Sequence, residues 1–319
     1  MEDYKIVRYN PNLFEETFEL LTSWWNQRYE DREDYLKWKY ENNPYADGPT
    51  GIVALQNNKV IGFRGYFATV WQVGEREFPA LVAGDTFVDI GHRRRGLSIM
   101  MGEKACEEFD PYYKFIINLE ATLAAVPGYL KLGFEPILDK RLLICSPLRK
   151  HGGIKNVEVS DKPKPQEMFN AVKRMHKITV KQDLEFFQYR FTSTIPHRYV
   201  FYFCKNDYMV VGCLPMSGDV GYIVDYTEND LESFETLLKK AMSADFKMMY
   251  MRNISLSSGV INILNKYRFR DNNLKNKNLC PILVRPVKKE IVEDDWFLNG
   301  LDMRDIANWK IKHIFSEWA

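Results

Sequence analysis

The 319-residue sequence lacks any long hydrophobic run and any marked excess of charge of one sign. No apolar run approaches the roughly 18 residues that a membrane-spanning helix needs, and the first residues lack the charged-then-apolar pattern of a signal peptide. Lys and Arg number 44 against 43 Asp and Glu, for a net charge of +1. This balance gives no global argument for binding nucleic acid or an anionic membrane. We therefore expect a cytoplasmic protein without nucleic-acid or membrane partners.

Cysteine and histidine are also scarce, at five residues each, and neither type is spaced like a metal site. The cysteines are dispersed and form no C-x-x-C pair, which favours reduced, packed thiols over a disulfide frame. The histidines show no ligand spacing, so we expect no metal. Aromatic residues, by contrast, make up 14% of the chain. Five of them gather early in the sequence, and their spacing favours core packing over an acceptor-binding wall: Trp24, Trp25, Trp38, Tyr40 and Tyr66.

The first half alternates between patterns typical of strands and of helices. Apolar runs separated by turns predict an antiparallel meander, and the later alternation of strand and helix predicts a parallel βαβ unit. Together they indicate an α+β, or mixed α/β, fold with a mostly antiparallel sheet flanked by helices. The expected strands are 5–9, a hairpin of 51–55 and 60–63, then 68–73, 78–82, 81–90 and 115–119. The expected helices are 12–28, 35–39, 97–109 and 122–132. The helix at 97–109 should place Met100, Met101, Lys104 and Ala105 on one face, and the helix at 122–132 should be interrupted by Pro127 and end at Gly133.

The second half reads as a degenerate copy of the first. Residues 34–40 are echoed at 185–191, Val60–Gly62 at Val210–Gly212, and Lys131–Phe134 at Lys266–Phe269, in the same order and at matched intervals. The stretch between the copies is rich in Lys, Gly and Pro. We therefore predict a first domain over 1–148, a linker over 149–166 and a second domain of the same fold over 167–319.

The segment Asp89–Ser98 lies where a predicted strand ends and a helix begins, and it contains three arginines and two glycines, Gly91 and Gly96. The first N–H groups of a helix lack intrahelical partners, and the helix dipole makes that end partly positive. A phosphate fits such a site, and Gly96 lets the backbone approach it closely. A solvated basic turn, with the glycine serving only backbone geometry, explains the same residues.

Two motifs together resemble the GNAT superfamily of N-acetyltransferases. Arg93, Gly96 and Ser98 occupy the signature positions of its pyrophosphate loop, R/Q-x-x-G-x-G/A, with Ser98 in place of Gly or Ala. Tyr129 stands four positions before the glycine of a Leu-Gly-Phe sequence. A third motif, N-x-x-A, is matched loosely from Thr122 and literally but earlier from Asn118.

This resemblance implies that acetyl-CoA is held in an opening between strands 81–90 and 115–119. The backbone of Phe87 and Val88 would pair with the pantetheine arm. The cofactor-binding residues would further include the whole loop: Arg93, Arg94, Arg95, Gly96, Leu97 and Ser98. It also implies direct attack of an amine on the thioester, with Tyr129 as general acid. For a base the sequence offers two candidates, Glu120 and Asp85, and a water chain is the alternative.

The second copy has lost these features. In place of the loop it has Asn229–Phe234, with no glycine or arginine and with two acids, so it should be catalytically silent. Its expected roles are to cover the open edge of the first sheet and to help shape the acceptor site. The predicted function is an N-acetyltransferase acting on a small-molecule or peptide amine. An aminoacyl or acyl transferase of the Fem type and a non-catalytic acyl-CoA-binding regulator are the alternatives.

Overall fold

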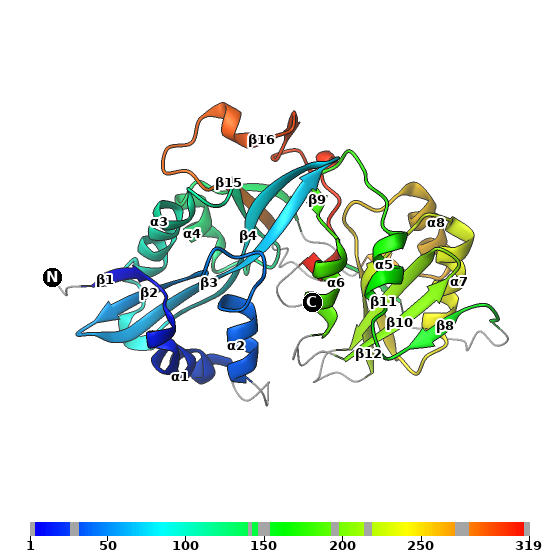
Figure 1. Cartoon of the computed structure of the whole chain (residues 1–319), viewed down its shortest axis with the longest axis horizontal. Helices are drawn as coiled ribbons and strands as arrows, with labels where there is room; N and C mark the ends of the chain where they lie inside the picture. Colours follow the sequence, from blue (N-terminus) through cyan, green and yellow to red (C-terminus); the bar gives the residue numbers. More distant parts are fainter. Residues whose placement is uncertain are drawn as a thin grey trace. The chain divides into compact units, whose positions relative to one another are not determined.

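The computed structural model describes residues 4–25, 32–139, 142–145, 154–192, 198–213, 219–271 and 281–315. The chain packs into two compact units (Figure 1). Unit 1 contains Met1–Asp139, Lys177–Lys181 and Cys280–Asn308. Unit 2 contains Lys140–His176, Gln182–Leu279 and Trp309–Ala319.

Unit 1 is built on one mixed sheet. Its strands, in spatial order, are β1 (Lys5–Arg8), β2 (Gly51–Gln56), β3 (Lys59–Val73), β4 (Arg76–Val88), β5 (Phe115–Asn118), β15 (Pro281–Pro286) and β6 (Glu135–Asp139). The short strand β9 (Thr179–Val180) pairs with β3. Every neighbouring pair is antiparallel except β4 and β5, which are parallel.

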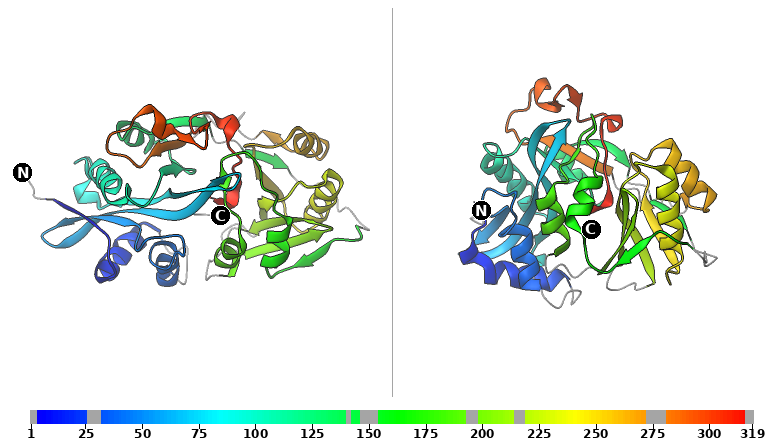
Figure 2. Two further views of the ribbon diagram at one scale, coloured as in Figure 1. Left: turned by 45° about the horizontal axis from the view of Figure 1, so that its top comes forward. Right: turned by 45° about the vertical axis from the view of Figure 1, so that its right-hand side comes forward.

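The helices of unit 1 lie on both faces of this sheet (Figure 2). The 3-10 turn η1 (Pro11–Leu13), α1 (Phe14–Trp25) and α2 (Arg32–Tyr40) are on one face, and α3 (Leu97–Phe109) and α4 (Val126–Lys131) are on the other. The face under α3 and α4 carries a continuous apolar core in which Leu81, Met101 and Phe109 are buried. The remaining elements of this unit are η2 (Ile90–His92), η4 (Glu293–Trp296), β16 (Phe297–Leu298), β17 (Leu301–Asp302) and η5 (Ile306–Asn308).

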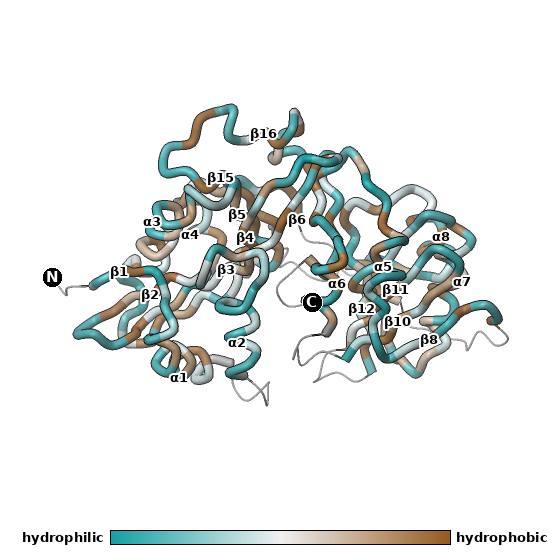
Figure 3. The backbone as a smooth tube through the Cα atoms, in the orientation of Figure 1, coloured by the Kyte–Doolittle hydropathy of each residue, from teal (hydrophilic) through white to brown (hydrophobic). Residues whose placement is uncertain are grey.

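Unit 2 repeats the architecture on a second mixed sheet. In spatial order its strands are β8 (Glu158–Ser160), β10 (Arg198–Cys204), β11 (Asp207–Cys213), β12 (Val220–Tyr226), β13 (Met248–Arg252), β7 (Leu142–Cys145) and β14 (Arg270–Asp271). The helical elements are α5 (Pro165–Ala171), α6 (Leu184–Thr192), α7 (Leu231–Met242), α8 (Ser258–Lys266) and η6 (His313–Phe315). Apolar residues concentrate on the strands and inner helix faces of each unit (brown in Figure 3), and α7 and α8 contribute Phe234 and Leu264 to the core of unit 2.

The two sheets share one strand order, and each includes a strand from the opposite half of the chain. In both, the fourth and fifth strands form the parallel pair, β4 with β5 and β12 with β13. The sixth position is taken by β15 in unit 1 and by β7 in unit 2. This repetition fits the duplication expected from the sequence. No single cut of the chain separates the units. β15, from the second half of the sequence, belongs to the sheet of unit 1, and β7, from the end of the first half, belongs to the sheet of unit 2.

Most of the predicted elements of the first half are present, with a few differences. The mixed, mostly antiparallel sheet flanked by helices is confirmed, and α3 has the predicted bounds. Residues 59–73 form one strand, because the β3–β4 hairpin turns only at Gly74. On α3, Met100 is exposed because Leu97, Met101 and Ala105 form the buried face.

The predicted linker also differs from the structure. Glu158–Ser160, inside the predicted 149–166 stretch, form β8 and pair with β10, and α5 begins at Pro165. The neighbouring Val157 packs against the core of unit 2, which draws this short strand onto the sheet. The domain limits at 148 and 167, which describe the order of the two copies along the chain, stay a prediction.

Candidate active site

The loop between β4 and α3 has a backbone suited to an anion. Arg94 has φ of +63° and Gly96 has φ of +80°, whereas the intervening Arg95 is not in the left-handed region. Left-handed residues in a tight turn help to direct backbone N–H groups toward one concave side, which suits an anion. A Cβ on Gly96 would meet nothing within 4 Å, so the glycine is required for its positive φ and not for lack of space.

The start of α3 adds the helix terminus to this concavity. Gly96 is the N-cap residue and makes no side-chain cap, while its carbonyl accepts from the N–H groups of Ile99 and Met100. The first N–H groups of α3 therefore remain available where the helix dipole is positive. Of the two readings that the sequence left open, this geometry favours the phosphate site over a plain basic turn.

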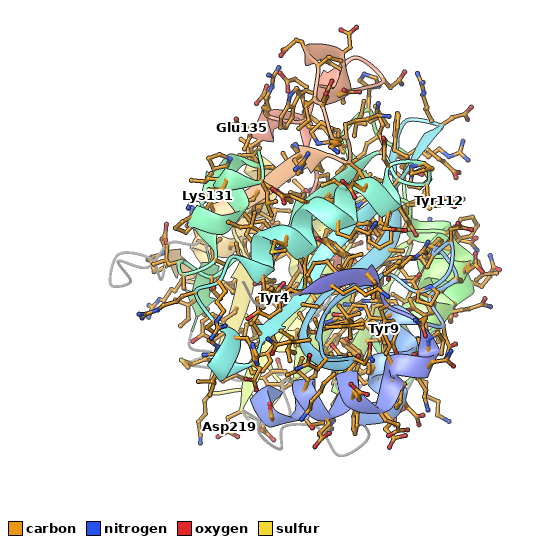
Figure 4. All side chains as sticks on the ribbon, turned by 90° about the vertical axis from the view of Figure 1, so that its left-hand side faces the viewer. Tyr4, Tyr9, Tyr112, Lys131, Glu135 and Asp219 are labelled. Atoms are coloured by element: carbon orange, nitrogen blue, oxygen red, sulfur yellow. The ribbon has the colours of Figure 1, made fainter. Side chains whose placement is uncertain are left out.

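Two of the three loop arginines, Arg93 and Arg95, make defined contacts. Arg93 Nε donates to the carbonyl of Val88 at 2.9 Å, and its guanidinium lies over the ring of Phe87 at 5.2 Å. Arg95 donates to the hydroxyl of Tyr4 (labelled in Figure 4) at 2.9 Å. These contacts fix the positive charge around the loop.

Next to this loop, β4 and β5 separate. They pair in parallel only from Ala80 to Val82, with Phe115 to Ile117 opposite. β4 then continues to Val88, and its pairing with β3 shifts register between Arg64 and Tyr66, which is a bulge on β4. The carbonyl of Val88 turns away from β3 and is the acceptor for Arg93. The predicted backbone groups of Phe87 and Val88 thus lie on the part of β4 that has left β5.

Tyr129 lies on α4 on the same face of the sheet. It is buried, and its ring meets Phe134 edge-on at 4.8 Å. The sequence Leu-Gly-Phe serves as the helix stop: Gly133 has φ of +79°, and the N–H of Phe134 donates to the carbonyl of Tyr129 at 3.1 Å. The motif therefore holds the tyrosine by a backbone turn and by ring packing.

The two base candidates have very different surroundings. Asp85 is buried and bonds Lys39 Nζ at 2.9 Å and the hydroxyl of Tyr40 at 2.6 Å. Both side chains of this ion pair are fully buried, so the carboxylate of Asp85 neutralises the buried positive charge of Lys39. Glu120 is partly buried just after β5, where its N–H donates to the side chain of Asn118 at 2.9 Å. Glu120 therefore lies at the end of β5, beside the place where β4 and β5 separate.

Asn118 and Thr122, the alternative matches to the third motif, both form local turns. Asn118 accepts from the N–H of Glu120 through its side chain, and Thr122 accepts from the N–H of Ala125 through its carbonyl. These contacts shape the connection between β5 and α4.

One residue that the motifs did not predict lies in the centre of this region. Arg64, on β3, is 2% exposed. It bonds the hydroxyl of Tyr66 at 2.8 Å and the carbonyl of Ser98 at 3.0 Å, and its guanidinium lies 4.7 Å from the ring centroid of Tyr129. A sequence signal existed, because an arginine in the middle of an otherwise apolar strand is unusual for a buried position.

A model of the acetyltransferase (GNAT) domain matches residues 5–137, which span the sheet, the loop and Tyr129. Residues 5–137 form a GNAT domain. The open β4–β5 pair, the turn before α3 and the α4 tyrosine are thus parts of one family fold. No curated protein matches the sequence.

Solved structures resemble the chain well beyond the GNAT domain. A GCN5-related N-acetyltransferase from Kribbella flavida has a TM-score of 0.66 and 11% identity, covering 89% of this chain and 72% of its own. A GCN5-related N-acetyltransferase from Anabaena variabilis has a TM-score of 0.64 and 12% identity, with 90% and 73% covered. Eis1 from Mycobacterium abscessus has a TM-score of 0.61 and 12% identity, with 89% and 74% covered. At these identities the likeness establishes the fold.

The corresponding helix start in unit 2 is built differently. α7 is capped by Asp230, whose carboxylate accepts from the N–H of Glu232 and from the hydroxyl of Ser233. These bonds, together with one from Lys205, lower the pKa of Asp230 to about 2. An internal carboxylate therefore occupies the position that the GNAT domain leaves open to an anion.

Other reactive groups of the described residues give no competing site. The thiols of Cys106, Cys145, Cys204 and Cys213 are free and buried, and Cys280 lies outside the described residues. Within the described ranges no three His, Cys, Asp or Glu side chains gather as metal ligands would. The same ranges contain no helix with the length and apolarity to cross a bilayer.

Proposed function

We propose that the GNAT domain transfers an acetyl group from acetyl-CoA to a primary amine of a small molecule or peptide. The observation that carries this proposal is the open helix start at Gly96, joined to the diverging β4 and β5 with Tyr129 on the same face of the sheet. A pyrophosphate suits the loop N–H groups. The backbone of Phe87 and Val88 suits the pantetheine arm, which would add to β4 like a short strand.

In this reaction the amine attacks the thioester carbonyl directly. A C–N bond forms, the C–S bond breaks, and the products are an acetamide and CoA thiol. The thiolate needs a proton, and Tyr129 is the proposed donor. The amine attacks only in its neutral form. Glu120 is the proposed group that accepts the proton of an ammonium substrate. Asp85 is not proposed as the base, because its negative charge balances Lys39.

A turnover assay tests this proposal. Release of CoA thiol is followed on a panel of amino sugars, amino acids, antibiotics and peptides, with wild type and Tyr129→Phe compared. The general acid of such a reaction contributes about a hundredfold or more to kcat, so the variant should lose that factor while still binding acetyl-CoA. Tight binding of acetyl-CoA without acetylation of any amine would contradict the enzymatic function and favour an acyl-CoA-binding regulator.

Unit 2 is proposed to be catalytically silent and to serve the fold of the whole chain. Asp230 at the start of α7 supports this, since a carboxylate there repels a phosphate. An aminoacyl or longer acyl donor of the Fem type is the remaining alternative, and the same assay with long-chain acyl-CoA and aminoacyl donors distinguishes it.

A further inference from the structure

Arg64 places a full positive charge inside the GNAT domain. Its side chain is 2% exposed, and its partners are neutral: Nε donates to the hydroxyl of Tyr66, and Nη1 donates to the carbonyl of Ser98 and reaches its hydroxyl at 3.3 Å. No carboxylate pairs with it among the described residues. Burying an ion that lacks a counter-charge costs several kcal/mol, so a second charge or a strong acceptor is expected nearby when the protein works.

One nitrogen of the Arg64 guanidinium, Nη2, lacks a hydrogen-bond acceptor among the described residues. This nitrogen is buried. Buried donors are nearly always paired, and an exception calls for a functional explanation. Arg285, another buried arginine of unit 1, shows the contrast: its Nε, Nη1 and Nη2 all donate to backbone carbonyls.

Thr86 supplies a second unsatisfied atom beside the first. It is the direct cross-strand neighbour of Arg64 in the β3–β4 ladder. Its Oγ1 is buried and likewise lacks a partner in the described part of the chain. Directly opposed residues share one face of a sheet, with Cβ atoms about 5 Å apart. The two unpaired groups therefore lie on the face that carries Tyr129.

The position of this pair along the site is also defined. Thr86 lies on the stretch of β4 that has separated from β5, three residues before the strand gives way to the loop. Arg64 reaches from β3 to Ser98 in the first turn of α3 and to the ring face of Tyr129. The pair thus stands between the proposed pyrophosphate loop and the proposed general acid.

We propose that Arg64 Nη2 and Thr86 Oγ1 form an inner subsite that binds a hydrogen-bond-accepting oxygen of the CoA moiety. This inference rests on the proposed function, since it assigns residues to the same ligand. The guanidinium only donates, and the threonine hydroxyl both donates and accepts, so an anionic or carbonyl oxygen satisfies both. Binding there also compensates the buried charge. The oxygen comes either from the phosphates or from an amide of the pantetheine arm.

Calorimetric titration of the full chain with CoA tests the subsite through Arg64→Met, Arg64→Lys and Thr86→Val. We expect CoA to bind about tenfold or more weakly to Arg64→Met, because a charge-assisted bond is lost. Arg64→Lys should recover part of the affinity, and Thr86→Val should lose about two- to fivefold. Adenosine 3′-phosphate 5′-diphosphate, which keeps all three phosphates of CoA but lacks pantetheine, identifies the oxygen: loss for both ligands assigns a phosphate oxygen, and loss for CoA alone assigns a pantetheine amide.

Arg285→Met is the matched control. It removes another buried arginine of the same unit, 5% exposed, whose three nitrogens all donate, so it should lower the melting temperature without selectively weakening CoA binding. Melting curves confirm that each variant is folded, and the conservative Thr86→Val carries the test if Arg64→Met fails to fold. Wild-type affinity in both Arg64→Met and Thr86→Val would overturn the subsite. If the wild type itself does not bind CoA, the proposed function fails instead.

Discussion

Among single residues, Gly96 has the backbone geometry on which the proposed acyl-CoA site depends. Its φ of +80° lies in the left-handed region, and the space where a Cβ would be is open. An L-residue held there costs about 1–2 kcal/mol. The strain falls on the turn that presents the first N–H groups of α3.

Gly96→Ala is expected to weaken acetyl-CoA binding by about fivefold to thirtyfold, as the turn relaxes and the N–H groups move. Gly74→Ala is the control, because Gly74 has φ of +63° and equal open space but lies in the distant β3–β4 turn. Both variants should lose similar stability in urea unfolding, and only Gly96→Ala should lose affinity. Equal affinities would show that the backbone of this loop does not hold the ligand.

Asp85 illustrates how burial changes the role that a sequence suggests. Replacing Asp85 by Asn leaves Lys39 as an unpaired buried charge, and we expect a loss of about 3–5 kcal/mol in the free energy of unfolding. The double variant Lys39→Met/Asp85→Leu removes both charges and should regain most of that stability. Urea unfolding measures both. Turnover retained by the double variant would establish that Asp85 is not the base, whereas loss of turnover in a stable double variant would restore it as a candidate.

At the scale of elements, sequence patterns predicted the first half of the chain well, because its strands and helices carry local signals. The bounds of α3, the Asn-rich β2–β3 turn and the helix stop at Gly133 all follow from side chains within the element itself. The loop and Tyr129 were found through their motifs. Arg64 left one local signal, an arginine within an apolar strand, but its link to Thr86 comes from cross-strand pairing, which no local pattern records.

We expect the contact between α7 and α8 to weaken in acid. Glu235 on α7 bonds Lys266 and Tyr267 at the end of α8, and these bonds lower its pKa to about 2. Because the folded-state pKa lies below the ordinary value of about 4.5, the stabilisation is full above pH 4.5 and is lost as the pH falls toward 2.

Glu235→Gln should therefore be about 1 kcal/mol less stable than wild type at pH 7, the upper end for an accessible ion pair. The difference should shrink between pH 4.5 and 2, where wild-type Glu235 takes up its proton. Urea unfolding across this range provides the comparison. A difference that stays constant down to pH 2 would contradict the contribution of the ionised carboxylate.

In the molecule as a whole, each sheet includes a strand from the other half of the chain: β15 in unit 1 and β7 in unit 2. This exchange was not predicted, because β7 and β15 are short apolar runs whose partners depend on long-range packing. β15 pairs with β5, which is one of the two strands that separate at the site. The CoA site should therefore depend on residues far from it in sequence.

Leu283→Asp in β15 should abolish CoA binding, since it places an unpaired carboxylate in the core of unit 1. Leu143→Asp in β7, although nearer in sequence to Tyr129, places the same charge in the core of unit 2 and should weaken CoA binding far less. Titration with CoA below the melting temperature of each variant compares them. The opposite ranking would contradict the strand exchange.

We expect the two-unit chain to hold one acyl-CoA, at the loop Arg93–Ser98 of the GNAT domain. Calorimetric titration of the full chain with acetyl-CoA measures this number. It should show one site per chain, weakened by Gly96→Ala and unchanged by Asp230→Asn at the start of α7. Two sites per chain, or one site that Gly96→Ala leaves intact, would contradict it.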